Sequence, residues 1–313
     1  MSAAYRAPAW LPGGHLQTLY AALRPPPPPA LARERWETPD GDFIDVDFAG
    51  PHAAAGMLVL FHGLEGSSAS HYARSTAAHF AARGWRCALP HFRGCSGEPN
   101  RLPRAYHSGD SDEIDWILRR LRAGRAAPIC AAGVSLGGNA LLKWLGERGA
   151  EARELVRSAA AVSAPLDLAA AGYTLDRGFN RELYARAFLR TMRRKALEKL
   201  RRFPGLYDAR RVARARTLYE FDDLVTAPLH GFRGVRDYWT RASSAPWLER
   251  IRVPALLLNA LNDPFLPAEA LLAASRRAAP EVVLEFPATG GHAGFPANPG
   301  WLPQRLDAFF STA

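Results

Sequence analysis

Short apolar runs alternate with helical stretches along most of this 313-residue chain, and no other feature restricts its possible folds as strongly. The apolar runs are uninterrupted, as in strands covered on both faces: residues 57–61, 87–89, 129–132, 156–162 and 255–258. Helical stretches lie between most of them, for example at 70–83, 110–122 and 138–148, and a late strand at 281–286 precedes a closing helix at 301–310. This order predicts an α/β fold with a mostly parallel sheet and helices on both faces.

The segment before these runs has a different pattern. Residues 33–38 and 42–48 flank Pro39-Asp40-Gly41 and are predicted to form a hairpin. In the second strand Ile44, Val46 and Phe48 alternate with Asp45 and Asp47. A period of two is typical of an antiparallel edge strand with one solvated face, so we expect the two aspartates to face water.

One long stretch lacks strand patterns. Residues 166–246 contain Arg-rich helical segments and are predicted to form a helical lid inserted between consecutive core strands. The domain interpretation is therefore an N-terminal segment at 1–30, ending in five prolines, and an α/β core at 31–165 and 247–313. The lid at 166–246 divides that core.

The most specific motif is Gly133-Val134-Ser135-Leu136-Gly137-Gly138, which follows an apolar strand and precedes a helix. This is the strand–turn–helix context of the nucleophile elbow, G-x-S-x-G. The glycines relieve crowding in a tight turn. The pattern predicts Ser135 as a nucleophile.

A serine nucleophile needs a base and an orienting carboxylate, in the chain order Ser, acid, His for this motif. His292 is the only histidine beyond residue 230 and lies in a loop after the strand at 281–286. Asp263 follows the strand at 255–258. Because the carboxyl ends of parallel strands share one edge of the sheet, we predict a triad of Ser135, Asp263 and His292.

When a serine attacks a carbonyl carbon, the tetrahedral intermediate carries a negatively charged oxygen. Two backbone N–H groups are expected to bind this oxyanion. Leu136 follows the nucleophile and supplies one. Leu64, in the loop His62-Gly63-Leu64-Glu65-Gly66, is predicted to supply the other. The nine histidines and three cysteines show no ligand spacing, so we predict no metal. We also predict no cofactor.

Two further clusters favour structural roles. The segment His91–Gly97 follows a strand and is interpreted as support for the catalytic loops. His107 and Asp112 have the H-x-x-x-x-D spacing found in some acyltransferases. We prefer helix capping by Ser108 or Asp110, with Asp112 and Glu113 in the first turn.

Composition and cysteine usage suggest the compartment. The chain is 48% hydrophobic and carries a net charge of +10, with Cys87, Cys95 and Cys130 as its only cysteines. Three cysteines cannot form a disulfide framework in a chain of this size. No continuous apolar segment resembles a signal peptide or a membrane span. We therefore expect a soluble cytoplasmic protein.

These motifs together resemble the type-4 α/β-hydrolases, comprising YheT-like bacterial esterases and their eukaryotic lipase relatives. The resemblance rests on the following pieces: Gly14-His15-Leu16-Gln17-Thr18, His62–Ser67, Phe92–Gly97, Tyr106–Gly109, Gly133–Gly138, Tyr219–Phe232, Asn262–Pro264 and Gly291–Gly294. It implies an α/β-hydrolase fold and hydrolysis of carboxylic esters, with the triad on Ser135, Asp263 and His292. His91 departs from the expected pattern, in which asparagine is more usual.

The resulting prediction is a serine carboxylesterase acting on small-molecule or lipid esters. Two alternatives stay open at this point. One is acyl transfer to an alcohol acceptor, and the other is a catalytically idle lipid-binding protein with the same fold.

The predicted lid is strongly basic. Residues 181–216 carry thirteen basic side chains against Glu182, Glu198 and Asp208. A solvated face explains this composition most simply, and nucleic-acid binding is disfavoured because few aromatic residues are interleaved. The sharper hypothesis is peripheral contact with an anionic membrane at the inner membrane face, with five apolar side chains entering the interface. These are Phe188, Leu189, Met192, Leu197 and Phe203.

Overall fold

The computed structural model describes residues 5–124, 127–296 and 300–313. These residues form an eight-stranded sheet in the order β1-β2-β4-β3-β5-β6-β7-β8. The strands are β1 (Ala32–Glu37), β2 (Phe43–Ala49), β3 (Met57–Phe61), β4 (Arg86–Pro90), β5 (Ile129–Val134), β6 (Ser158–Val162), β7 (Ala255–Leu258) and β8 (Val282–Glu285). Only β1–β2 and β2–β4 pair antiparallel; the remaining pairs are parallel. The predicted fold class is therefore confirmed.

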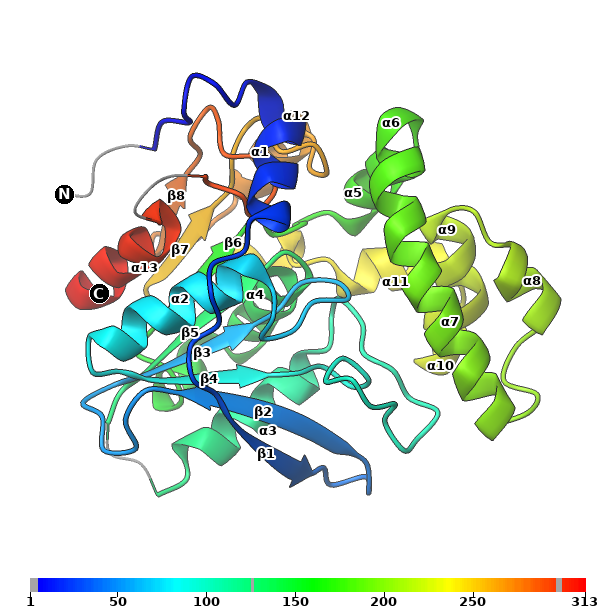
Figure 1. Ribbon diagram of the computed structural model, residues 1–313, viewed down its shortest axis with the longest axis horizontal. Helices are drawn as coiled ribbons and strands as arrows, with labels where there is room; N and C mark the ends of the chain where they lie inside the picture. Colours follow the sequence, from blue (N-terminus) through cyan, green and yellow to red (C-terminus); the bar gives the residue numbers. More distant parts are fainter. Residues whose placement is uncertain (1–4, 125–126, 297–299) are drawn as a thin grey trace.

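Helices cover both faces of the sheet, as the continuous apolar strands require (Figure 1). One face packs against α2 (His71–Ala82) and α13 (Trp301–Thr312), through side chains such as Phe80 and Phe310. The opposite face packs against α3 (Ser111–Arg122), α4 (Leu136–Arg148) and α12 (Ala268–Ser275), through side chains such as Ile117 and Leu141. Short turns at η1 (Gly149–Glu154) and η4 (Ala245–Arg250) complete this layer.

Between β6 and β7, residues 163–254 are all described and contain no strand. Figure 1 shows most of the helices of this insertion gathered to one side of the sheet. They are α5 (Leu168–Leu175), α6 (Gly178–Asn180), η2 (Arg181–Ala185), α7 (Arg186–Arg202), α8 (Ala209–Arg214), α9 (Leu218–Phe221), η3 (Asp222–Thr226), α10 (Ala227–Leu229) and α11 (Val235–Ala242). The insertion has its own apolar cluster, which includes Leu189, Val212 and Phe221.

Two features differ from expectation. Helix α1 (Gly13–Leu23) forms within the N-terminal segment, for which no element was predicted. The expected solvated face of β2 is wrong, because Asp45 and Asp47 are buried. Asp47 lies 2.7 Å from Arg33 Nε and 2.8 Å from His91 Nε2, and Asp45 lies 2.8 Å from Arg35 Nε. The alternation of β2 is real, but its polar side is covered by these charged partners, and β1 rather than β2 lies at the edge.

The Asp47 cluster yields a pH-dependent prediction. The Arg33 guanidinium and the His91 and Ser68 hydrogen bonds outweigh desolvation and hold the pKa of Asp47 below its usual range. A lowered carboxyl pKa stabilises the fold above the unfolded pKa of about 3.9, and this stabilisation is lost as pH falls below it. We expect Asp47→Asn to lower the free energy of unfolding by about 3 kcal/mol at pH 7. The difference from wild type should shrink below about pH 4.

Urea unfolding at several pH values would measure this difference. Glu37→Gln is the control, because it breaks only an exposed ion pair with Arg101. A constant effect of Asp47→Asn between pH 7 and pH 3 would contradict the explanation.

Candidate active site

Ser135 occupies a strained turn between β5 and α4. Its backbone has φ +54° and ψ −120°, a conformation that side-chain-bearing residues rarely adopt. Two close approaches explain the flanking glycines. A Cβ on Gly133 would lie 2.4 Å from the carbonyl oxygen of Gly137, and a Cβ on Gly137 would lie 2.5 Å from that of Phe61. The strand–turn–helix geometry predicted for this motif is therefore present.

The three residues predicted to act together lie in one hydrogen-bonded line. Ser135 Oγ is 2.9 Å from His292 Nε2, and His292 Nδ1 is 2.8 Å from Asp263 Oδ2. Asp263 Oδ1 accepts a hydrogen bond of 2.8 Å from the backbone N–H of Phe265. The Phe265 ring stacks on His292 with its centroid 4.1 Å away. Both oxygens of the buried carboxylate are therefore engaged, and the imidazole is held on one face by an aromatic ring.

The loop that contains Leu64 is anchored from several sides. Buried His62 accepts from the N–H of Phe92 through Nε2, which leaves Nδ1–H to donate to the carbonyl of Gly63 at 2.8 Å. Burial lowers the pKa of His62 to about 3, so it stays neutral in this role. The Tyr72 hydroxyl accepts from the N–H of Gly63 at 2.8 Å. The His-Gly pair marks this loop in the sequence, but its anchors come from distant positions and leave no local pattern.

The two predicted oxyanion donors are available. Within the described ranges, the N–H groups of Leu64 and Leu136 have no hydrogen-bond acceptor. Both residues line the cavity that also contains Ser135 and His292. Glu65, the next residue in the loop, has φ +54°, and its own N–H donates to the Tyr106 hydroxyl at 2.8 Å.

Two adjoining cavities lie at this end of the sheet. The first has a volume of about 100 Å³ and an apolar wall formed partly by Leu175, Trp239 and Phe265. The second has a volume of about 530 Å³ and lies beneath α7, with both charged and apolar walls. Both are lined by Leu64, Leu136, Met192, Asp222 and Tyr238. The second cavity therefore lies between core loops, such as residues 93–107, and helix α7 of the insertion, next to the cavity that contains the serine.

Helix α7 reaches across to the loop at 62–66, which contains Leu64. Lys195 Nζ lies 2.9 Å from Glu65 Oε1, which also accepts from the Tyr106 hydroxyl at 2.9 Å. Lys199 donates to the carbonyls of Leu102 and Arg104 at 2.9 and 2.8 Å. These contacts join the helical insertion to the core beside the site.

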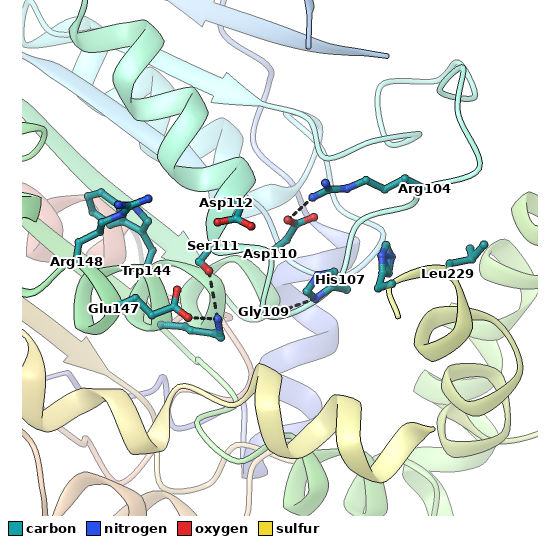
Figure 2. Close-up of a pocket in the computed structure, with 12 residues that line it drawn as sticks. Arg104, His107, Gly109, Asp110, Ser111, Asp112, Trp144, Glu147, Arg148 and Leu229 are labelled. Atoms are coloured by element: carbon teal, nitrogen blue, oxygen red, sulfur yellow. Dashed lines mark hydrogen bonds and ion pairs between the residues drawn. The ribbon is translucent and has the colours of Figure 1, made fainter. Parts of the chain in front are cut away.

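A larger pocket of about 650 Å³ lies beside α3 and α4, and its walls include neither Ser135 nor His292 (Figure 2). His107 and Asp110 border it. The expected cap on α3 is wrong in detail: the helix begins at Ser111, but Asp110 makes no side-chain cap and instead accepts from Arg104 Nη2 at 2.6 Å. Ser108 does not cap either, since its oxygens accept from Asn139.

His107 and His91 have structural environments. His107 Nδ1 accepts from the N–H of Gly109 at 3.2 Å, and its ring packs 4.6 Å from that of His230. Burial lowers the pKa of His107 to about 3. His91 is buried against Asp47, and its Nδ1 lies 3.3 Å from the carbonyl oxygen of Cys95. This placement agrees with a supporting role for the segment His91–Gly97.

Among the described residues, no group of three or more His, Cys, Asp or Glu side chains is arranged to hold a metal ion. No described helix is both long and apolar enough to cross a membrane.

The geometry agrees with comparisons to known proteins. Residues 56–299 match the family model described as alpha/beta hydrolase fold, and the chain belongs to this family. Within it, the chain is 39% identical over 290 residues to "Putative esterase YheT" of Escherichia coli K12, covering 89% of this chain and 84% of that protein. The resemblance to YheT-like α/β-hydrolases is therefore confirmed.

More distant relatives extend the comparison. The human protein "Phospholipase ABHD3" is 30% identical over 305 residues, covering 93% of this chain and 73% of that protein. A solved Pyrococcus furiosus esterase shares the fold, with a TM-score of 0.60 at 16% identity, covering 90% of this chain and 91% of that one. The predicted enzyme class, a carboxylic ester hydrolase, is confirmed at this general level.

The tight packing at the elbow predicts a specific stability effect. Gly137→Ala places a methyl group against the backbone oxygens of Phe61 and His62, 2.5 and 2.6 Å away, where no flexible side chain can yield. We expect the free energy of unfolding to fall by about 1–3 kcal/mol. Thermal unfolding would measure it. Gly300→Ala is the control, because its new methyl meets Pro303 at an ordinary 3.4 Å; equal stability of the two variants would contradict the packing argument.

Proposed function

We propose that the chain is a serine hydrolase in which Ser135, Asp263 and His292 form the catalytic triad. The observation that carries this proposal is the continuous hydrogen-bonded line from Asp263 through His292 to Ser135, with distances of 2.8 and 2.9 Å. Order in the chain, placement after three parallel strands and the strained backbone at Ser135 support the same roles.

In the proposed reaction, Ser135 Oγ attacks the ester carbonyl carbon as His292 Nε2 takes its proton. Asp263 holds the imidazole tautomer with Nδ1–H toward the carboxylate and stabilises the imidazolium. The N–H groups of Leu64 and Leu136 bind the oxyanion. Collapse of the tetrahedral intermediate expels the alcohol, which receives the proton from His292. Water activated by His292 then releases the acid from the acyl-serine.

For the substrate, we propose carboxylic esters with short- to medium-chain acyl groups, including acylglycerol-like lipids. The cavity beside Ser135 is apolar but small, at about 100 Å³. The adjoining space of about 530 Å³ falls within the usual range for small-molecule sites. A yeast relative named "Monoacylglycerol lipase", 28% identical over 84% of this chain, supports a lipid ester as one candidate.

Neither alternative function gains support from a specific contact. The histidine of the H-x-x-x-x-D spacing, His107, is held by Gly109 and packed among rings. A triad with connected hydrogen bonds favours turnover over idle binding. Adding an alcohol acceptor to the assays below would reveal acyl transfer as ester exchange.

The proposed triad predicts that its variants lose activity to different degrees. The activity is measured on a panel of esters that differ in acyl length. We expect Ser135→Ala and His292→Ala each to lower kcat by about 10⁶-fold, and Asp263→Asn by about 10⁴-fold because the base remains but is misoriented. Ser75→Ala, on α2, is the matched control and should retain full activity. Turnover by Ser135→Ala at the wild-type rate would refute the assignment.

We retain peripheral contact with an anionic membrane as a second proposal, in a reduced form. Ten arginines of residues 181–216 are exposed, for instance Arg186 and Arg190 on α7. The apolar part of the hypothesis is wrong for four of its side chains. Leu189 is buried inside the insertion, and Phe188, Met192 and Leu197 pack against the same cluster. Of the five side chains, only Phe203 lies outside this cluster, so the proposed contact rests mainly on the exposed arginines.

This predicts co-sedimentation with anionic but not zwitterionic vesicles, weakening as salt rises. At about 1 kcal/mol for each arginine near the surface, the double variant Arg186→Gln/Arg190→Gln should bind about 30-fold more weakly. Arg276→Gln/Arg277→Gln, which removes two exposed arginines outside the insertion, is the control. Equal binding to both vesicle types, or no binding to either at low salt, would contradict the proposal. The basic face would then be explained by contact with solvent alone.

A further inference from the structure

Helix α1 lies against both loops that carry the proposed acid and base of the triad. Figure 1 shows it (blue) above the strands of the sheet in this view. Two of its polar side chains are buried: Gln17 is 1% exposed and Thr18 is 7% exposed. Buried polar groups on a short helix need partners, and here the partners belong to the loops that follow β7 and β8.

Gln17 joins the two loops. Its Oε1 accepts from the N–H of Gly290 at 2.8 Å and from Nδ2 of Asn262 at 3.0 Å. Its Nε2 donates to the carbonyl of Leu11 at 2.8 Å, which fixes the orientation of the amide. Asn262 in turn accepts from the N–H of Gly291 at 3.0 Å. The residues next to Asp263 and His292 are thus tied to each other through one side chain.

Thr18 binds the backbone of the base itself. Its Oγ1 accepts from the N–H of His292 at 2.8 Å and donates to the carbonyl of Gly14 at 2.7 Å. Direct backbone packing accompanies these bonds. A Cβ on Gly14 would lie 1.9 Å from the carbonyl oxygen of Asn262, and a Cβ on Gly291 would lie 2.7 Å from that of Gly14.

The loop around His292 requires such support. Gly291, Ala293 and Phe295 all have positive φ, at +63°, +52° and +38°. For the side-chain-bearing residues Ala293 and Phe295, such a backbone conformation persists only when surrounding contacts over-determine it. Ser163 Oγ accepts from the N–H of Ala293, but the N–H groups of Gly290 and His292 depend on α1.

We propose that Gln17 and Thr18 are positioning residues that hold His292 and Asp263 in reactive alignment, so that α1 is a functional part of the site. This inference rests on the proposed triad. Neither side chain contacts the reacting atoms. They act through the backbone of the base and the neighbour of the acid, where small displacements cost large factors in rate.

The test removes the Thr18 hydroxyl while keeping side-chain volume. We expect Thr18→Val to lower kcat by about 10–100-fold with KM nearly unchanged, because the base is misplaced but the substrate cavity is intact. Thr18→Ser keeps the hydroxyl and should restore most of the rate. As a control away from the site, Thr312→Val removes an exposed helix hydroxyl on α13 that is bonded to Ala308 four residues earlier, and it should have no effect.

A readout independent of turnover separates positioning from general stability. In a Ser135→Ala background, proton NMR follows the strongly deshielded Nδ1–H of His292 that the bond to Asp263 creates. We expect this resonance in Thr18→Ser, and its loss or broadening in Thr18→Val at temperatures well below unfolding. If folded Thr18→Val keeps both the resonance and the kcat of Thr18→Ser, the inference is overturned.

Gly14→Ala provides a second variant if Thr18→Val does not fold. Its methyl forces α1 away from Asn262 without removing a hydrogen-bonding group, and the same fall in kcat is expected; unchanged kcat would count against the proposal. Failure of the triad itself looks different. If the wild type hydrolyses no ester, or Ser135→Ala remains active, the proposed function fails, while the NMR comparison still reports whether α1 holds His292 against Asp263.

Discussion

The carboxyl edge of a parallel sheet is the constraint on which this molecule's chemistry depends. β5, β6, β7 and β8 run parallel in neighbouring positions, so the loops after β5, β7 and β8 leave the sheet at one edge. Ser135 and His292, which are 157 positions apart in the chain, therefore meet at 2.9 Å. The sheet supplies proximity, and the remaining structure must supply precise alignment, because the loops themselves have little regular structure.

That alignment comes from two segments outside the sheet. Beside the proposed acid and base, side chains of α1 accept hydrogen bonds from the N–H groups of Gly290 and His292. Beside the proposed oxyanion donors, Lys195 of the helical insertion pairs with Glu65, one residue after Leu64. The insertion is thus more than a cover. Its composition suggests a basic outer surface, but some of these side chains point toward the core. Lys195 binds Glu65, and Lys199 donates to the carbonyls of Leu102 and Arg104.

Sequence was most informative where a local pattern and its chemistry coincide. Continuous apolar runs predict buried strands, and a serine between closely packed glycines predicts the elbow, because both are properties of neighbouring residues. The edge-strand interpretation of Asp45 and Asp47 failed for the opposite reason. Arg35, Arg33 and His91 cover these carboxylates, and alternation within one strand carries no information about partners on other elements. The predicted capping of α3 was wrong for a similar reason, because the Asp110 carboxylate accepts from Arg104 instead of from the first backbone N–H groups of the helix.

Helix α1 shows the same limit from the functional side. Its motif was specific enough to mark family membership, yet nothing in residues 14–18 indicates what Gln17 and Thr18 bind. Their partners, Asn262, Gly290 and His292, lie about 245 to 275 positions away. A buried glutamine and threonine on a short N-terminal helix would ordinarily weaken packing, since each polar group must be matched. Here the matching groups include the backbone N–H groups of Gly290 and His292, in a loop with positive-φ residues. Each hydrogen bond therefore satisfies a buried group on α1 and a backbone group on the loop. The polar side chains of α1 thus fix its position at the edge of the sheet.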